Sequence, residues 1–341
     1  MYFARHIAAT PDGAEARVLV GAGVDGPWVD LRVAERVRLE RGGADSVAAR
    51  RLAAALVTGS LADGIAAGEA FLDAARAALA DGEGAGRLEV VPSLTNALDP
   101  SGYRDHMIFS GHFSRAWELR GEPVPEVLFE LPVAYVGNPE SFVGPGAEVP
   151  WPAYGRRLDY ELELGVVIGR AGTGLRPEDA DAHVFGFTIL NDFSARDIQF
   201  REMEGRLGPC KGKHFGCAAG PVVATADELD WRAGLRMRAR LNGETVCDGN
   251  SNEAIFGLDE VVAWASQGET LRPGWLLGSG TVNGGSSIEI GREVAPGDEI
   301  ELEIEGLGVL RNRFGRPAEG GWEPSGDRRG APGEPDGTEA R

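Results

Sequence analysis

The segment Leu158 to Leu164 constrains the fold most, because its residues alternate strictly between bulky uncharged and acidic side chains. Neighbouring residues of a β-strand point to opposite faces of the sheet. The alternation therefore predicts a strand with three carboxylates, Asp159, Glu161 and Glu163, on one face. Same-face neighbours lie roughly 7 Å apart, so Glu161 and Glu163 can converge on one cation. The alternative is a half-exposed strand whose acidic face is solvated.

Two further segments carry residues that suit such a site. Asp192 follows an apolar, strand-like run at 184–190, and loops at strand ends commonly carry functional groups. Asp192 could instead cap a helix, although capping alone would not explain Arg196 and Gln199. Lys213 lies within a glycine-flanked turn, where it could approach a ligand or balance clustered carboxylates. The alternative for Lys213 is an exposed basic turn.

The segment Asp105 to His112 places a carboxylate and two imidazoles close together in sequence. A lone histidine is usually structural or exposed. A catalytic role for either histidine therefore depends on whether it reaches the cavity that holds the predicted carboxylates. There, a neutral imidazole could accept a proton from water at physiological pH. A site made only of carboxylates suits a hard cation, so we expect Mg²⁺, with Mn²⁺ or Ca²⁺ as alternatives ahead of zinc.

Composition narrows the classes of protein that fit. The chain has 341 residues and a formal charge of −19, which opposes binding to nucleic acid. Its three cysteines form no CxxC pair, so neither a disulfide framework nor a zinc knuckle is indicated. The sequence lacks the apolar run of a signal peptide or of a membrane span. We therefore expect a cytoplasmic protein without a membrane or nucleic-acid partner.

The pattern along the chain predicts a mixed α/β (α+β), β-rich fold in two domains. A smaller N-terminal domain over residues 1–95 combines short strands, including 28–33, with two helices over 45–79. A strand-rich domain over 103–317 follows the proline-containing segment 92–103. Residues 319–341 are rich in glycine, proline and charge, which predicts a disordered tail.

Within the strand-rich domain the runs of apolar and alternating residues predict individual elements. Strands are expected at 158–168, 184–190, 220–224, 236–241 and 298–311. Helices are expected at 177–182, where a proline can occupy the first helical position, and at 253–266.

An ordered set of motifs over residues 103–315 resembles the fumarylacetoacetate hydrolase family. The set comprises the Asp105-to-His112 segment, L-P-V-A-Y at 131–135, the E-L-E strand, N-D-F-S-A-R-D-I-Q, L-G-P-C-K-G-K-H-F-G, G-S-G-T and the closing E-I-E-G-L-G-V-L-R-N-R. The resemblance implies a fumarylacetoacetase-type C-terminal β-roll domain with a smaller N-terminal domain, and a homodimer.

The resemblance also implies roles for individual residues. Asp105, Glu161, Glu163 and Asp192 match the family's metal ligands, with Lys213 beside them. His112 matches the catalytic base, and Glu289 the glutamate that orients it. The residues expected around the substrate are Tyr135, Arg196, Gln199, Gly216 and Thr281. Some members carry a His-x-x-Glu pair instead, but Arg115 occupies that position here, which favours Glu289 as the partner.

The function implied by the resemblance is metal-dependent hydrolysis of a C–C bond in a 1,3-dicarbonyl or acylpyruvate-type substrate. His112 would activate water while the metal stabilises the departing carbanion as an enolate. Met107, Phe193 and Cys217 depart from the animal fumarylacetoacetases, which leaves the substrate open. The alternatives are an oxaloacetate decarboxylase or a 2-oxo diacid isomerase or hydratase that uses the same site, and a metal-stabilised binding protein without turnover.

Overall fold

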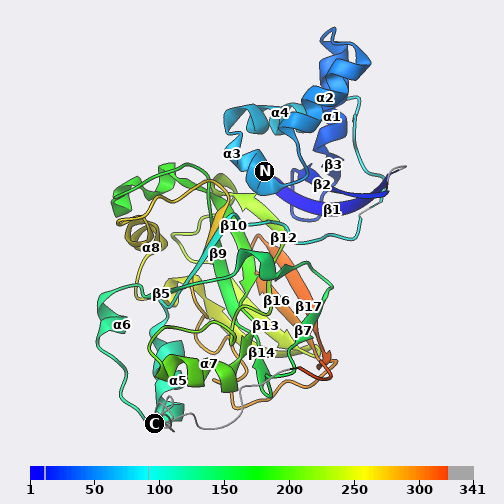
Figure 1. The fold of residues 1–341 in the computed structure, drawn as a ribbon. Coiled ribbons are helices and arrows are strands. Elements are labelled where there is room, and N and C mark those ends of the chain that lie inside the picture. The colour runs from blue at the N-terminus through cyan, green and yellow to red at the C-terminus, as the bar shows by residue number, and fades with distance from the viewer. Residues whose placement is uncertain (11–12, 91, 322–341) are drawn as a thin grey trace, which may run out of the picture.

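The computed structural model describes residues 1–10, 13–90 and 92–321. These residues form two main β-sheets with helices around them, and the sheets do not close into a barrel (Figure 1). The mixed, strand-rich fold class is therefore confirmed. Most of the predicted disordered tail, from residue 322 to 341, lies outside the described residues.

The larger sheet holds the centre of the molecule. Its strand order is β3-β2-β1-β12-β10-β9-β15-β4-β5, with β6 paired to β12. The central strand β9 is buried along its whole length, as expected for a strand covered on both faces. The strands are β1 (Tyr2–Thr10), β2 (Gly13–Gly21), β3 (Trp28–Asp30), β4 (Gly102–His106), β5 (Ala134–Val136), β6 (Phe142–Val143), β9 (Leu162–Ile168), β10 (Val184–Asn191), β12 (Cys217–Thr225) and β15 (Trp275–Gly278).

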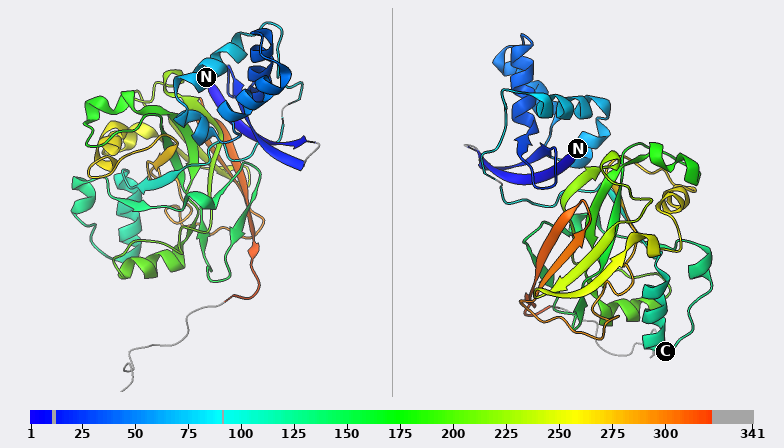
Figure 2. Two further views of the ribbon diagram at one scale, coloured as in Figure 1. Left: turned by 45° about the horizontal axis from the view of Figure 1, so that its top comes forward. Right: turned by 180° about the vertical axis from the view of Figure 1, so that it is seen from behind.

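The second sheet has five strands in the order β14-β13-β16-β17-β7 and faces the viewer in the right-hand view of Figure 2. Its strands alternate buried and more exposed residues, so that β13 buries Met237, Ala239 and Leu241. The strands are β7 (Glu148–Trp151), β13 (Arg236–Leu241), β14 (Glu244–Asn250), β16 (Glu299–Ile304) and β17 (Gly308–Pro317), and a separate small pair joins β8 (Leu158–Asp159) to β11 (Ser194–Ala195).

The helices fall into two groups along the chain. Four of them, grouped at the top of Figure 1, are α1 (Leu31–Arg41), α2 (Ser46–Leu56), α3 (Leu61–Ala66) and α4 (Glu69–Ala80). The others are α5 (Ser110–Arg120), α6 (Val127–Glu130), α7 (Arg196–Glu204) and α8 (Leu258–Ala265), and short 3₁₀ helices occur at η1 (Pro139–Ser141), η2 (Pro177–Ala182), η3 (Ala226–Glu228) and η4 (Ser251–Glu253). Within the described ranges, no helix has the length and apolar character needed to cross a membrane.

Several predicted elements differ from those observed. The run 28–33 was expected to be a strand throughout, but the observed strand β3 ends at Asp30. Helix α1 begins directly after it, because the Asp30 side chain caps the helix by accepting a hydrogen bond from the Val33 N–H. The predicted two helices over 45–79 are three, and the run 298–311 is a hairpin of two strands, β16 and β17. The predicted helix at 177–182 is a 3₁₀ helix.

The N-terminal segment continues the sheet of the strand-rich part. Strand β1 pairs antiparallel with β12, with Tyr2 opposite Ala224 and Phe3 opposite Val223. Phe3 is fully buried and its ring lies 5.4 Å from that of Phe71 and 5.6 Å from that of Phe185. One hydrophobic core therefore runs from the helices α3 and α4 into the central sheet.

Candidate functional site

Four carboxylates from four places in the chain meet at one end of the central sheet. Asp105 lies on β4, Glu161 just before β9, Glu163 on β9, and Asp192 directly after β10. One oxygen from each lies within 4.8 Å of the others, and all four side chains are buried. The solvated acidic face is thereby excluded for Glu161 and Glu163, and Asp192 caps no helix, because Ala195 precedes α7.

The predicted strand over 158–168 is interrupted beside the cluster, which separates Asp159 from the other two acids. β8 ends at Asp159 and β9 begins at Leu162. The Asp159 carboxylate accepts hydrogen bonds from Arg196 Nε and the Ser287 N–H, both at 2.8 Å. The expected common face therefore holds for Glu161 and Glu163 but not for Asp159, which anchors Arg196.

Two buried cations compensate part of the negative charge. Lys213 Nζ lies 2.5 Å from Glu161 Oε2 and 2.6 Å from Asp192 Oδ2. Arg196 Nη1 lies 2.8 Å from Glu161 Oε1. The Tyr135 hydroxyl donates to Asp192 Oδ2 at 2.7 Å. Lys213 is almost completely buried, so the alternative of an exposed basic turn is wrong.

The charges in the cluster shift the pKa values of its acids in opposite directions. Burial alone would raise the pKa of Glu161, but Lys213 and Arg196 outweigh it and lower that pKa to about 2. Burial, together with the charge of Asp192, raises the pKa of Asp105 well above its usual range. Burial and the adjacent Asp105 likewise raise the pKa of Glu163 well above its usual range. The surrounding protein alone therefore disfavours the ionised forms of Asp105 and Glu163, which a bound cation would stabilise.

The donor set fits a divalent cation. Four carboxylates supply only oxygen ligands, which hard cations such as Mg²⁺, Mn²⁺ and Ca²⁺ prefer. Asp105 Oδ1 and Glu163 Oε1 are buried and accept no hydrogen bond from the described residues. A buried carboxylate oxygen without a partner is costly, and a cation would satisfy both oxygens. The buried acidic cluster could therefore hold one divalent ion.

A glycine makes room for the cluster between the strands that carry it. Gly278 ends β15, which lies between β9 and β4 in the sheet. A β-carbon at this position would lie 2.1 Å from Asp105 Oδ1 and 2.8 Å from Glu163 Oε2. Only glycine lets both carboxylates approach each other here. The G-S-G-T motif contained this signal, although Gly278 was not predicted as a site residue.

His112 faces the cluster from the start of α5, with Glu289 behind it. His112 Nδ1 lies 2.8 Å from Glu289 Oε2, and His112 Nε2 lies 3.7 Å from Glu161 Oε1. Glu289 also accepts from the Gly284 N–H and from the Ser286 hydroxyl. Burial would raise the pKa of Glu289, but His112 and Ser286 together lower it. Glu289 is therefore held ionised beside the imidazole, in the arrangement expected of a base and its orienting group.

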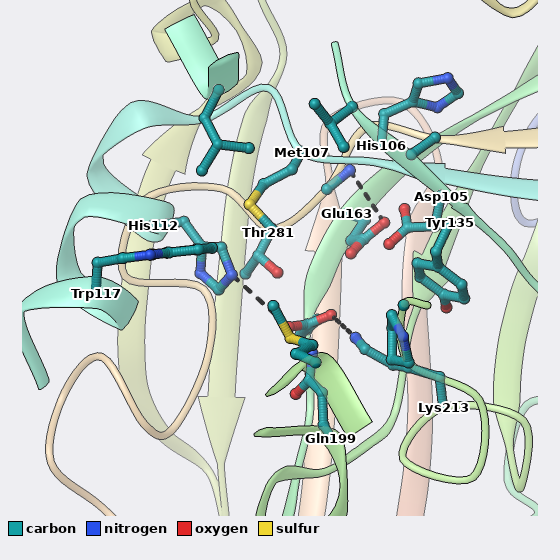
Figure 3. Close-up of a pocket in the computed structure, with 18 of the residues that line it drawn as sticks. Asp105, His106, Met107, His112, Trp117, Tyr135, Glu163, Gln199, Lys213 and Thr281 are labelled. Carbon is teal, nitrogen blue, oxygen red and sulfur yellow. Dashed lines mark hydrogen bonds and ion pairs between the residues drawn. The ribbon is translucent and has the colours of Figure 1, made fainter. Parts of the chain in front are cut away.

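A cavity of about 280 Å³ connects His112 with the cluster. Figure 3 shows His112 and Lys213 on opposite sides of it, with Thr281 between them. Of the predicted substrate residues, Tyr135, Gln199 and Thr281 line the cavity. Arg196 is paired with Glu161, and neither Arg196 nor Gly216 is among the described residues that line the cavity.

Several residues of the site were missed from sequence. Asn191 accepts from the Glu161 N–H and Asn283 from the His112 N–H, so both fix the backbone beside a functional side chain. Asn191 stands next to Asp192 in sequence, which was a usable signal. No sequence signal indicated Asn283, because its contact with His112 joins two segments that are distant in sequence.

A strand-rich mixed α/β fold, a buried all-oxygen cluster and a facing histidine–glutamate pair define a class of enzymes that act on small molecules at a divalent-cation site. The family model "Fumarylacetoacetate (FAA) hydrolase C-terminal" matches residues 102–315. The chain therefore belongs to the fumarylacetoacetate hydrolase family, as its motifs predicted.

Individual relatives support the same family. The human mitochondrial protein named oxaloacetate tautomerase FAHD2A is 36% identical over 254 residues, which cover 72% of this chain and 76% of the relative. The Bacillus subtilis oxaloacetate tautomerase YisK is 35% identical over 214 residues, or 62% of this chain and 67% of that protein. The fumarylacetoacetate hydrolase structure from Exiguobacterium antarcticum has a TM-score of 0.68 at 26% identity, covering 92% of this chain and 99% of that one.

These comparisons confirm the family but not the hydrolytic reaction that we expected. Two of the relatives carry the name of a tautomerase, whereas the solved structure carries the name of a hydrolase. The human relative is named as mitochondrial, so the cytoplasmic location of this chain stays a prediction.

Proposed function

We propose that the chain catalyses keto–enol tautomerisation of a 2-oxo dicarboxylic acid such as oxaloacetate. The observation that carries this proposal is the His112–Glu289 pair, which opens onto the same cavity as the four carboxylates. Tautomerisation needs one group that moves a proton between carbon and oxygen, and no nucleophile. The names of the two tautomerase relatives point in the same direction.

We assign the cation to Asp105, Glu161, Glu163 and Asp192, with Mg²⁺ as the expected ion. When bound, the ion would supply positive charge that stabilises the enolate oxygen of the substrate. Lys213 and Tyr135 hold the Asp192 carboxylate in place from the protein side. Arg196, itself anchored by Asp159, does the same for Glu161.

His112 performs the proton transfer in this proposal. Because Nδ1 lies 2.8 Å from the Glu289 carboxylate, we assign the proton of the neutral imidazole to Nδ1, which leaves Nε2 free to accept a proton from the carbon next to the ketone. Glu289 stabilises the positive imidazolium that results. The same nitrogen then delivers the proton to the enolate oxygen, which completes the conversion from ketone to enol.

The cavity favours a compact substrate. Its volume of about 280 Å³ lies near the lower end of small-molecule pockets, which span roughly 300–1,000 Å³. The side chains of Met107, Trp117, Leu128 and Met203 form an apolar part of the cavity wall. This wall limits access of bulk water to the proton in transfer.

Hydrolysis of a small acylpyruvate is the second candidate, because the His112–Glu289 pair could equally activate a water molecule. The two candidates differ in products. A tautomerase returns an isomer of the substrate, whereas a hydrolase returns two shorter acids, which mass spectrometry distinguishes.

The test is the rate at which enolic oxaloacetate converts to the ketone, followed by ultraviolet absorbance with Mg²⁺ or Mn²⁺. The protein should accelerate the conversion well beyond the same metal alone. His112→Ala should lower turnover by roughly 10²- to 10⁴-fold while metal affinity stays near normal, because the imidazole is no ligand. Glu289→Gln should show a smaller loss in the same direction.

His183→Ala is the matched control, since the His183 side chain contacts the Arg170 carbonyl and is not among the described residues that line the cavity. Its activity should equal that of the wild type. The proposal fails if the wild type adds nothing to the metal-catalysed rate, or if His112→Ala converts oxaloacetate as fast as the wild type does.

A further inference from the structure

Arg206 follows α7 and has an unusual backbone conformation. Its φ is +58°, and among the described residues the only other non-glycine with positive φ is Asn242. Asn242 lies in the turn between β13 and β14, where asparagine is common. A left-handed conformation is disfavoured for arginine, so the surrounding loop must hold it there. Backbone strain of this kind often accompanies a functional position.

Arg206 differs from the two other positively charged side chains of the site, Lys213 and Arg196, in having no carboxylate partner among the described residues. Lys213 lies between Glu161 and Asp192, and Arg196 is paired with Asp159 and Glu161. Arg206 lines the same cavity and is exposed. No carboxylate in the described ranges forms an ion pair with it, so its charge is available to a ligand.

Among the described residues that line the cavity, only Lys213 and Arg206 carry a permanent positive charge, and Lys213 is already paired with Glu161 and Asp192. One end of the cavity is the acidic cluster, where a cation would receive a 2-oxo acid group. Much of the wall is apolar, formed by Met107, Trp117, Leu128, Val133 and Met203. The chain carries a formal charge of −19, so a dianion gains little from the overall field of the protein. A distal carboxylate therefore needs a local cation.

Arg206 and Lys213 belong to the same loop, and Glu202 anchors that loop to α7. The Glu202 carboxylate accepts from the N–H groups of Cys210, Lys211 and Gly212 at 2.8–3.0 Å. Burial would raise the pKa of Glu202, but these hydrogen bonds lower it, so the anchor is ionised at neutral pH. The anchored loop thus limits the distance between Lys213, which contacts the carboxylate cluster, and Arg206, which lines another part of the cavity.

We infer that Arg206 binds the distal carboxylate of the substrate and thereby selects 2-oxo dicarboxylic acids over 2-oxo monocarboxylic acids. This inference rests on the proposed function and names the substrate class of the same site. The guanidinium supplies two parallel N–H donors, which match a carboxylate.

The kinetic test compares a four-carbon 2-oxo diacid with its distal methyl ester, which lacks the second charge. Arg206→Met should lower kcat/KM for the diacid by roughly 10- to 100-fold, mainly through KM, as expected for a lost hydrogen bond between charged groups. The ester should react equally with wild type and variant. Arg206→Lys should recover part of the loss, since it restores the charge without the bidentate geometry.

Arg201→Met is the matched control, because Arg201 is an exposed arginine of α7 that does not line the cavity. It removes the same charge and should leave both substrates unaffected, which separates local contact from the overall field. The inference is overturned if Arg206→Met keeps the wild-type preference for the diacid, or if Arg201→Met loses it equally.

A binding experiment separates this inference from the proposed reaction. Malate, a 2-hydroxy diacid, and lactate, its monocarboxylic counterpart, are titrated calorimetrically into Mn²⁺-loaded protein. The wild type should bind malate more tightly than lactate, and Arg206→Met should remove that difference. If oxaloacetate is not turned over but this pattern holds, the proposed function fails and the carboxylate site stands. Equal binding of malate by wild type and Arg206→Met overturns the inference even if turnover is observed.

Discussion

At the scale of single residues, Glu161 lies between the carboxylate cluster with its two cations and the His112–Glu289 pair. Its carboxylate contacts Lys213 through one oxygen and Arg196 through the other, and His112 faces it at 3.7 Å. These contacts lower its pKa to about 2 despite burial. Glu161 is thus fully ionised at neutral pH, whether the cation is bound or absent.

His106 provides a pH test that is independent of turnover. It is buried, and its Nδ1 lies 3.1 Å from the Gly278 carbonyl. Burial lowers its pKa from 6.5 to about 4. Between these values the unfolded chain binds a proton that the folded chain does not, so the free energy of unfolding falls as the pH falls from 6.5 towards 4. The loss should be on the order of 3 kcal/mol.

Urea unfolding at pH 7 and pH 5 measures this effect. His106→Gln should lose less stability between the two pH values than the wild type does, because glutamine binds no proton. His183→Gln, at a more exposed position, should behave as the wild type. Equal losses in wild type and His106→Gln would show that His106 is not held neutral by burial.

At the scale of elements, the sequence predicted strands better than their interruptions. The run 236–241 matches β13, because its alternation reflects one buried face. The break between β8 and β9 could not be predicted, since it depends on Asp159 bonding to Arg196 and to the distant Ser287. Helix α5 was missed although Gly121 marks its end with a left-handed φ of 67°.

The contrast between local sequence patterns and contacts of residues distant in sequence also explains which parts of the site could be predicted. Residues within recognisable motifs, such as Glu163, Asp192 and Lys213, were identified and meet at the cluster. Arg206 and Asn283 were not, because their places depend on loop geometry and long-range contacts. The resemblance supplied Glu289, which local sequence patterns alone would not have indicated.

Gly278 on β15 yields a prediction at this scale. In Gly278→Ala the new methyl group would overlap Asp105 Oδ1, so either the carboxylate or the strand must move. We expect a loss of stability of roughly 1–3 kcal/mol, typical of overpacking. Mn²⁺ affinity should also fall, measured by calorimetry. Gly82→Ala is the control, since no atom of the described residues other than its own chain neighbours lies within 4 Å of its β-carbon position. Wild-type Mn²⁺ affinity in Gly278→Ala would refute the requirement for glycine.

At the scale of the whole molecule, the N-terminal helices and the strand-rich part share one core. Phe3 on β1 stacks on Phe71 and also contacts Phe185. The predicted domain division at residues 92–103 and the homodimer both stay predictions. The shared core indicates that the two parts depend on each other for stability.

Phe3→Ala tests this dependence by scanning calorimetry. We expect one cooperative transition in the wild type, and a variant destabilised by about 3–5 kcal/mol that still unfolds in one transition. Ile7→Ala, on the same strand but 55% exposed, should change little. Two separate transitions, of which Phe3→Ala shifts only one, would show that the parts fold independently.

The central claim is that the four buried carboxylates bind one divalent cation, and calorimetric titration with Mn²⁺ tests it most directly. The wild type should bind one ion per chain, and the near-isosteric variants Glu161→Gln and Asp192→Asn should lose most of that affinity while remaining folded by circular dichroism. Glu204→Gln, at an exposed position outside the cluster, should bind as the wild type. Folded Glu161→Gln and Asp192→Asn proteins with wild-type Mn²⁺ affinity, or a wild type that binds no ion, would contradict the claim.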